Sequence, residues 1–146
     1  MNCAAHGVAT ARFVLADDSL SRLDGTFDLV HSFIVFQHLP VDRGERLLSL
    51  LLDRIAPGGA GALHFLVGER RSPAQRLAAF VRRRVPLGRN VVNVLRGRPF
   101  GAPNMEMNAY DLARLLRILG DHGVGEVCVE GTDHGGYLGA MLVFRR

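Results

Sequence analysis

The chain has 146 residues, of which 48% are hydrophobic, and its formal net charge is +4. This length suits one compact domain, and the hydrophobic content is high enough for a core and excludes a disordered chain. No apolar stretch reaches the roughly 18 residues of a membrane span, and residues 1–7 lack the basic and apolar regions of a signal peptide.

The chain contains two cysteines, Cys3 and Cys128, which lie far apart in the sequence. This usage fits free thiols in a reducing cytosol better than a disulfide framework, so we expect a cytoplasmic protein. The cysteine spacing does not match a zinc motif, and no metal site is predicted.

Two short apolar runs near the N-terminus predict strands. Residues 11–16 (ARFVLA) read as a buried strand that ends at Asp17 and Asp18. Residues 27–33 (FDLVHSF) read as a second strand, which the chain enters from a turn at Gly25.

A helix and a third strand are predicted next. Residues 41–55 carry leucines at helical spacing, and Asp42 with Glu45 three residues later is close to a capping box, with Asp42 as the N-cap. The Pro-Gly-Gly sequence at 57–59 predicts the end of this helix, and residues 60–67 (AGALHFLV) predict a buried strand.

The second half of the chain predicts more helix and a closing hairpin. Residues 73–85 predict a basic helix and residues 97–103 a loop, after which a helix starts at Asn108 or Asp111 and runs to about Leu119. Two further strands are predicted at 124–129 and 138–144, joined by a glycine-rich turn at 131–136. Strands that alternate with helices predict a parallel α/β sheet, with an antiparallel hairpin at its edge.

A pair of motifs adds a family resemblance to this pattern. The stretch FDLVHSFIVFQHLP (27–40), then a helix, then L-x-x-I-A-P-G-G (52–59) resembles the fourth strand and the entry to the fifth strand of class I S-adenosylmethionine-dependent methyltransferases. Residues 11–18 resemble the third strand with its acidic end, and the closing hairpin resembles the sixth and seventh strands. The resemblance covers nearly the whole chain. It implies an α/β, partial Rossmann-like methyltransferase fold, with a parallel sheet and a C-terminal antiparallel hairpin.

The resemblance also implies a set of cofactor-binding residues. Ligands of open α/β sheets bind beyond the carboxyl ends of the strands, where Asp17, Asp18, Ser32 and Phe33 are predicted to lie. In the family, the counterpart of Asp17 accepts a hydrogen bond from the adenine amine of S-adenosylmethionine, the next residue offers its backbone N–H, and the loop at Ser32 and Phe33 lines the methionine side. The alternative for Asp17 is an aspartate that only shapes a turn.

His38 is the candidate catalytic residue. In many relatives a histidine at this "HLP" position lies near the reaction centre, where it can act as a general base for a hydroxyl or amine acceptor. The alternative is a histidine that orients the loop, because direct methyl displacement depends mainly on alignment. His31 and His64 lie within predicted strands and are read as structural, and residues 132–136 (TDHGG) are read as the hairpin turn.

The sequence departs from the family at its most characteristic point. It contains no match to the acid followed by a Gly-x-Gly-x-Gly-like turn that holds the cofactor, and the family's first two strands are absent. Residues 1–7 resemble the end of the helix before the third strand. We therefore expect a truncated domain at 1–146: a shortened gene product, a wrongly assigned start, or one half of a complex.

Three functions follow from these observations. The first is methyl transfer from S-adenosylmethionine to an unknown small-molecule acceptor, the second is an arginine-rich binding module, and the third is a degenerate remnant without activity. The second rests on nine arginines and no acid between Arg70 and Arg98, which could bind an anionic partner or a membrane surface. The alternative for this segment, taken as an insert at 70–104, is a solvated lid over the active site. The oligomeric state is not predicted.

Overall fold

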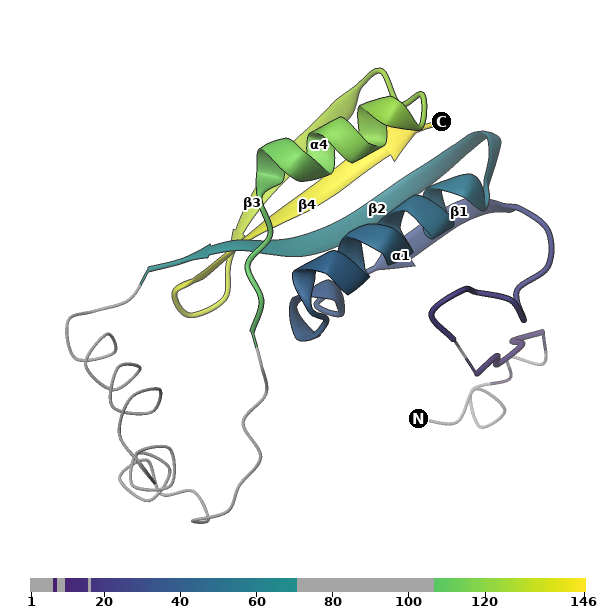
Figure 1. Ribbon diagram of the computed structural model, residues 1–146, viewed down its shortest axis with the longest axis horizontal. Helices are drawn as coiled ribbons and strands as arrows, with labels where there is room; N and C mark the ends of the chain where they lie inside the picture. The colour runs from purple at the N-terminus through teal and green to yellow at the C-terminus, as the bar shows by residue number, and fades with distance from the viewer. Residues whose placement is uncertain (1–6, 8–9, 16, 71–106) are drawn as a thin grey trace, which may run out of the picture.

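The computed structural model describes residue 7 and residues 10–15, 17–70 and 107–146 (Figure 1). The elements in chain order are β1 (Phe27–Ser32), the 3-10 turn η2 (Phe36–His38), α1 (Val41–Asp53), β2 (Ile55–Glu69), α4 (Leu112–Asp121), β3 (Val127–Asp133) and β4 (Tyr137–Arg145). They form a four-stranded sheet in the order β1-β2-β4-β3. β1 and β2 are parallel, whereas β4 is antiparallel to both β2 and β3. The predicted α/β class, the parallel pair and the closing antiparallel hairpin are confirmed.

The core lies between one face of the sheet and the two helices, which run along that face in Figure 1. Side chains alternate between the faces of a strand, so the register places Val30, Gly61, Phe144 and Val127 in one row beneath the helices. The buried leucines of α1 and α4 and the buried aromatic rings fill this layer. The opposite face is barer, with Leu29 60% and Val143 42% exposed.

The two helices begin in different ways. Asp111 caps α4, because its carboxylate accepts hydrogen bonds from the backbone N–H groups of Ala113 and Arg114, so the later of the two predicted starts is correct. α1 begins directly after Pro40, and no side chain caps it. The prediction of Asp42 as N-cap is wrong. Residue 42 already lies inside the first turn, because the extended conformation of Pro40 leads straight into the helix.

β2 is longer than predicted. The helix α1 ends at Asp53, and β2 starts at Ile55 and includes the Pro-Gly-Gly sequence that was expected to end the helix. The parallel register shifts from Phe27↔Ile55 to Leu29↔Ala60, so residues 56–59 form an irregular insertion at the sheet edge. Gly58 has φ +78, a conformation that glycine adopts without strain, and this permits the bend.

The strand predicted at 11–16 is not formed. Residues 10–15 have no regular secondary structure, Phe13 and Leu15 are 80% and 76% exposed, and residue 16 lies outside the described residues. The segment lies off the sheet in Figure 1. The physical reason is that a strand needs a neighbour for its N–H and C=O groups, and in the described part of the chain no strand pairs with it.

The closing hairpin is confirmed, but its bounds differ from the prediction. β3 continues to Asp133, and the turn is confined to 134–136. The predicted helix at 73–85, the loop at 97–103 and, except for Arg70, the arginine-rich segment lie outside the described residues. None of the helices in the described ranges is both long and apolar enough to span a bilayer.

Candidate functional site

A pocket of about 330 Å³ lies beside the carboxyl end of β1, between the segment before β1 and the outer face of α1. Its lining residues are Asp17, Asp18, Leu20, Ser32, Val35, Phe36, Leu39, Arg43, Arg46, Leu47 and Leu51. The pocket thus joins an apolar wall to a small number of polar groups, as small-molecule sites commonly do. It brings together three of the four predicted cofactor-binding residues.

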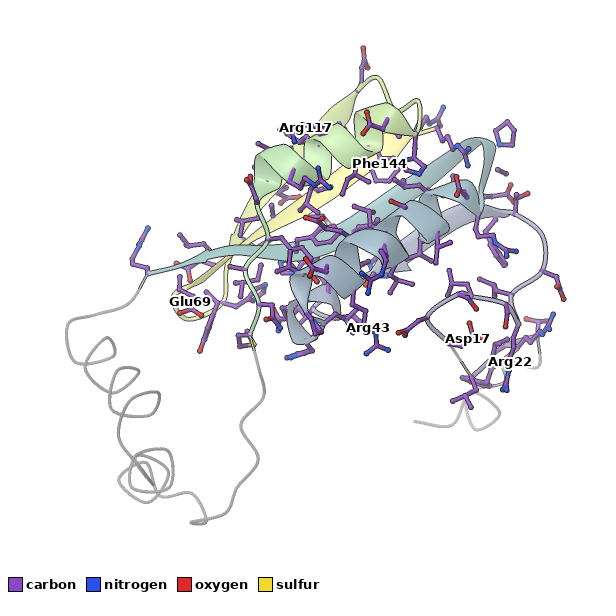
Figure 2. The ribbon with its side chains drawn as sticks, viewed as in Figure 1. Asp17, Arg22, Arg43, Glu69, Arg117 and Phe144 are labelled. Carbon is purple, nitrogen blue, oxygen red and sulfur yellow. The ribbon has the colours of Figure 1, made fainter. Side chains whose placement is uncertain are left out.

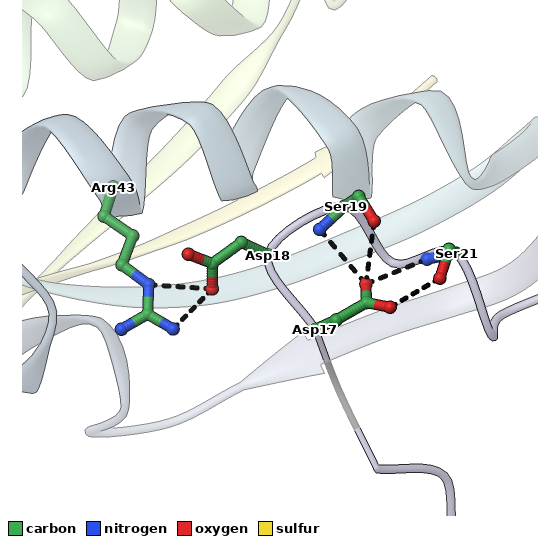
Figure 3. Close-up of polar contacts among 5 residues, drawn as sticks. All are labelled: Asp17, Asp18, Ser19, Ser21 and Arg43. Atoms are coloured by element: carbon green, nitrogen blue, oxygen red, sulfur yellow. Dashed lines mark hydrogen bonds and ion pairs between the residues drawn. The ribbon is translucent and has the colours of Figure 1, made fainter.

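Asp17 occupies a turn that its own carboxylate stabilises (Figure 3). Oδ1 accepts from the backbone N–H of Ser19 at 3.1 Å, the Ser19 hydroxyl at 3.0 Å and the backbone N–H of Ser21 at 3.0 Å. Oδ2 accepts from the Ser21 hydroxyl at 2.5 Å. These hydrogen bonds, with the Ser21 hydroxyl first, hold the pKa of the Asp17 carboxyl well below its usual range. Both sequence interpretations of Asp17 therefore remain compatible with its position, because it shapes a turn and also lines the pocket.

Asp18 faces α1 rather than the pocket centre. Its Oδ1 accepts from Arg43 Nε at 2.9 Å and from Arg43 Nη2, which closes one side of the pocket with an ion pair. In Figure 2, Asp17 lies on the segment before β1 and Arg43 lies on α1. Both partners of the ion pair are about half exposed or more, so it orders the pocket rim and contributes little to global stability.

Ser32 ends β1, and the chain turns sharply two residues later. Ile34 has φ +58, a conformation that costs a β-branched residue about 1–3 kcal/mol and is concentrated at functional sites. The turn places Val35 and Phe36 along the pocket wall next to Ser32.

Phe33 lies outside the pocket. Its ring packs against the imidazoles of His64 and His134, with centroid distances of 4.9 and 5.8 Å. His64 is fully buried and its Nε2 lies 2.8 Å from Thr132 Oγ1, a placement compatible with its interpretation as a structural residue. Burial, and next the nearby His134, lower the pKa of His64.

His38 is the last residue of η2, and it does not line the pocket. Its backbone N–H donates to Val35 O at 3.0 Å, and its Nε2 lies 3.2 Å from Gln37 Nε2. Phe36, two residues before it, and Leu39, directly after it, do line the pocket.

Sequence reasoning missed three residues of this region. Leu20, with φ +52 and 8% exposure, lines the pocket, Arg43 forms an ion pair with Asp18, and the Tyr110 hydroxyl donates to the carbonyl of Phe36 in η2. A leucine between two turns gives no sequence signal for such a role. Arg43 and Tyr110 act through contacts with residues 25 and more than 70 positions away, which no local pattern shows.

Comparisons with known proteins bear on the fold of the chain. No family profile matches the sequence, and no curated protein matches it. Among solved structures, it is similar to the magnesium protoporphyrin IX methyltransferase of Synechocystis PCC 6803 with bound S-adenosylhomocysteine, at 20% identity and a TM-score of 0.59, covering 98% of this chain and 56% of that one. It is also similar to an O-methyltransferase family protein of Burkholderia thailandensis, at 16% identity and a TM-score of 0.58, covering 99% of this chain and 38% of that one.

These similarities show the fold. The chain has the fold of the C-terminal portion of a class I S-adenosylmethionine-dependent methyltransferase, as the sequence predicted. It spans about half or less of the length of these proteins.

Proposed function

We propose that this chain forms part of an enzyme that transfers a methyl group from S-adenosylmethionine to a small-molecule acceptor, and that its pocket binds the adenine end of the cofactor. The observation that carries this proposal is the meeting of Asp17, Asp18 and Ser32 in one pocket at the carboxyl end of a parallel strand. Ligands of open α/β sheets bind at that edge. Among the structural neighbours, the Synechocystis methyltransferase binds S-adenosylhomocysteine and an enzyme of Planctomyces limnophilus is in complex with apigenin, which supports a small-molecule acceptor.

The described residues fit the adenine end. Asp17 Oδ1 already accepts three hydrogen bonds, but Oδ2 accepts one and keeps a lone pair for an exocyclic amine. The apolar wall formed by Leu20, Val35 and Leu39 suits a flat ring. The glycine-rich loop and the ribose-binding acid of the family have no counterpart in this sequence, so the pocket supplies only part of a cofactor site.

The bound cofactor supplies an electrophilic methyl group, and the chain's own residues hold and align the reactants. Displacement of this kind depends on holding the acceptor and the methyl group in line, which binding can accomplish without a catalytic base. In this proposal Asp17 and Ser32 hold the cofactor, and His38, directly before Leu39 of the pocket wall, orients the acceptor or receives its proton.

Chemical-shift mapping by NMR on the full 146-residue chain tests the proposal. Adenosine and S-adenosylhomocysteine, each at millimolar concentration, are expected to shift the same backbone amides around Asp17, Leu20 and Leu39, whereas methionine is expected to shift none of them. Val35→Arg places a charged side chain at the pocket wall and is expected to abolish these shifts. Val143→Arg is the control, because Val143 is similarly exposed on the distant sheet face and its replacement is expected to leave them intact. Shifts that lie elsewhere, or that survive Val35→Arg, contradict the proposal.

A further inference from the structure

One wall of the pocket beside β1 is held by a tyrosine that is not among the residues lining it. Phe36 and Leu39 line this pocket, and the Tyr110 hydroxyl donates to their carbonyl oxygens at 2.9 and 3.2 Å. Carbonyl oxygens only accept hydrogen bonds, so the phenol is the donor in both contacts. The two carbonyls belong to the two ends of the loop at 36–39. A single hydroxyl group therefore fixes both ends of this stretch of the pocket wall.

The position of Tyr110 is itself well determined. The residue is 2% exposed, and its ring packs against Phe65 and Phe36 with centroid distances of 5.3 and 6.4 Å. Its backbone N–H donates to Leu66 O in β2 at 2.7 Å. Burial, and next the nearby Glu45, raise the pKa of Tyr110 to about 12, so the hydroxyl keeps its proton at neutral pH. Tyr110 thus joins the loop at 36–39 to the central part of the sheet.

The same hydroxyl also lies against α1, which forms the facing wall of the pocket. Gly44 has no side chain at this point, and a methyl group there would overlap with the Tyr110 hydroxyl. Arg43, the residue before Gly44, lines the pocket and forms the ion pair with Asp18. The contact between Tyr110 and Gly44 therefore limits how closely the loop at 36–39 and the start of α1 approach each other.

We propose that Tyr110 is a positioning residue of the adenine pocket, and that its hydroxyl holds Phe36 and Leu39 in place against α1 before the ligand arrives. This inference rests on the proposed function, in which the pocket takes the adenine end of the cofactor. A wall that is already ordered loses less conformational freedom on binding, which increases the affinity. Without the hydroxyl, both carbonyls lose their donor and the wall must be ordered by the ligand.

Adenosine titrations followed by NMR on the full 146-residue chain test this inference. Tyr110→Phe keeps the ring and its packing, removes only the hydroxyl, and is expected to raise the Kd for adenosine about 3- to 10-fold. Gly44→Ala keeps the hydroxyl but displaces it from the opposite side, and is expected to raise the Kd as well.

Two control variants separate this effect from general ones. Tyr137→Phe removes the hydroxyl of the chain's other tyrosine, which does not line the pocket. Ile118→Val removes part of a buried side chain on α4 and controls for a loss of stability, which thermal unfolding measures in each variant. Both controls are expected to leave the Kd for adenosine unchanged.

Amide hydrogen exchange in the ligand-free chain tests the positioning without adenosine. The backbone N–H of Leu39 donates to Phe36 O at 2.9 Å, the same oxygen that the Tyr110 hydroxyl binds. Tyr110→Phe is expected to speed exchange at Leu39 at least about 5-fold more than at Leu142 in the interior strand β4, whose exchange follows the overall stability.

The two measurements have distinguishable outcomes. If the wild type does not bind adenosine, the proposed function fails, and the exchange at Leu39 alone decides whether Tyr110 holds the loop. Equal acceleration at Leu39 and Leu142 would reduce Tyr110 to a general contributor to stability and overturn the inference. An unchanged Kd for adenosine in Tyr110→Phe, in a wild type that binds, overturns it as well.

Discussion

At the scale of single residues, Asp17 and Asp18 show how two neighbouring carboxylates acquire different tasks. Asp17 turns back onto Ser19 and Ser21, whereas Asp18 reaches across to Arg43 on α1 (Figure 3). The difference arises from the turn itself, which directs consecutive side chains to opposite sides. One acid therefore shapes the segment, and the other attaches it to the helix.

Asp17 is expected to keep its turn folded far into the acidic range. Its folded pKa is depressed, so its hydrogen bonds are fully present above the unfolded pKa of about 3.9 and are lost only as the pH falls towards the folded value. Asp17→Ala is expected to speed amide hydrogen exchange at Ser21 at pH 7. Asp24→Asn, which removes an exposed acid from the same segment, is the control and is expected to leave that exchange unchanged. Equal exchange in wild type and Asp17→Ala would show that the turn does not depend on Asp17.

His64 is expected to make the fold sensitive to acid. Burial and His134 lower its folded pKa below the unfolded value of about 6.5, so the unfolded chain binds a proton that the folded chain excludes. Stability is then expected to fall as the pH drops below about 6.5. Urea unfolding at pH 8 and pH 5.5 measures this loss. The loss of stability between pH 8 and pH 5.5 is expected to be smaller in His64→Leu and unchanged in His122→Gln. If His64→Leu loses as much stability as the wild type, the acid sensitivity comes from other groups.

At the scale of the elements, the stabilisation that an acidic residue gives to a helix depends on whether it caps the helix or only lies in the first turn. Asp111 accepts from two backbone N–H groups at the start of α4, and Asp42 only lies in the first turn of α1. Asp111→Ala is expected to lower the free energy of unfolding by about 1 kcal/mol through the lost cap. Asp42→Ala is expected to cost only about 0.3 kcal/mol, through the helix dipole. Urea unfolding of both variants makes the comparison, and equal losses would contradict the assignment of the caps.

The glycines of α1 and α4, Gly44 and Gly120, are expected to respond in opposite directions to replacement by alanine. Gly120 on α4 faces open space, so Gly120→Ala is expected to stabilise the fold by up to about 1 kcal/mol through helix propensity. Gly44 on α1 lies directly under the Tyr110 hydroxyl, and an added methyl group would overlap with it. Gly44→Ala is therefore expected to cost about 1–3 kcal/mol.

Thermal unfolding measures both glycine variants. The double variant Gly44→Ala with Tyr110→Phe is expected to recover part of the loss, because the phenylalanine lacks the oxygen that the methyl group meets first. If Gly44→Ala is as stable as the wild type, Tyr110 does not pack closely against α1 at Gly44.

At the scale of the whole molecule, the described strands and helices form one layered unit, and the pocket lies at one edge of its sheet. The sheet, α1 and α4 share one core, and the pocket at the end of β1 uses groups from the preceding segment, the η2 loop and α1. Among the described residues, adenine would meet one carboxylate oxygen that can still accept a hydrogen bond, Asp17 Oδ2, and one apolar wall. The pocket is thus expected to recognise the cofactor weakly.

This expectation can be given a magnitude. A hydrogen bond to a charged group contributes about 1.5–3 kcal/mol, and a Kd of 1 mM corresponds to about 4 kcal/mol. The 146-residue chain is therefore expected to bind S-adenosylhomocysteine with a Kd of about 1 mM or weaker, measured by calorimetry. A longer chain that adds a glycine-rich loop and a ribose-binding acid is expected to bind at least about 100-fold more tightly. Tight, stoichiometric binding by the 146 residues would contradict the view that they supply only part of the site.

The sequence by itself determined the elements whose signals are local. The apolar runs of β1, β2 and β4, the leucine spacing of α4, and the family motifs at 27–40 and 52–59 were sufficient to predict the α/β class and the closing hairpin. These predictions succeed because the periodicity of a strand or helix depends on residues only a few positions apart.

Only the tertiary structure decided the features that depend on distant partners. The run at 11–16 has the composition of a strand but remains irregular, because hydrogen bonding to a neighbouring strand, and not composition, makes a strand. Asp18 pairs with an arginine 25 residues away, and the loop that carries His38 is held by Asn108 and Tyr110, about 70 residues further along the chain. Such contacts leave no local pattern, because they join residues that lie far apart in the sequence.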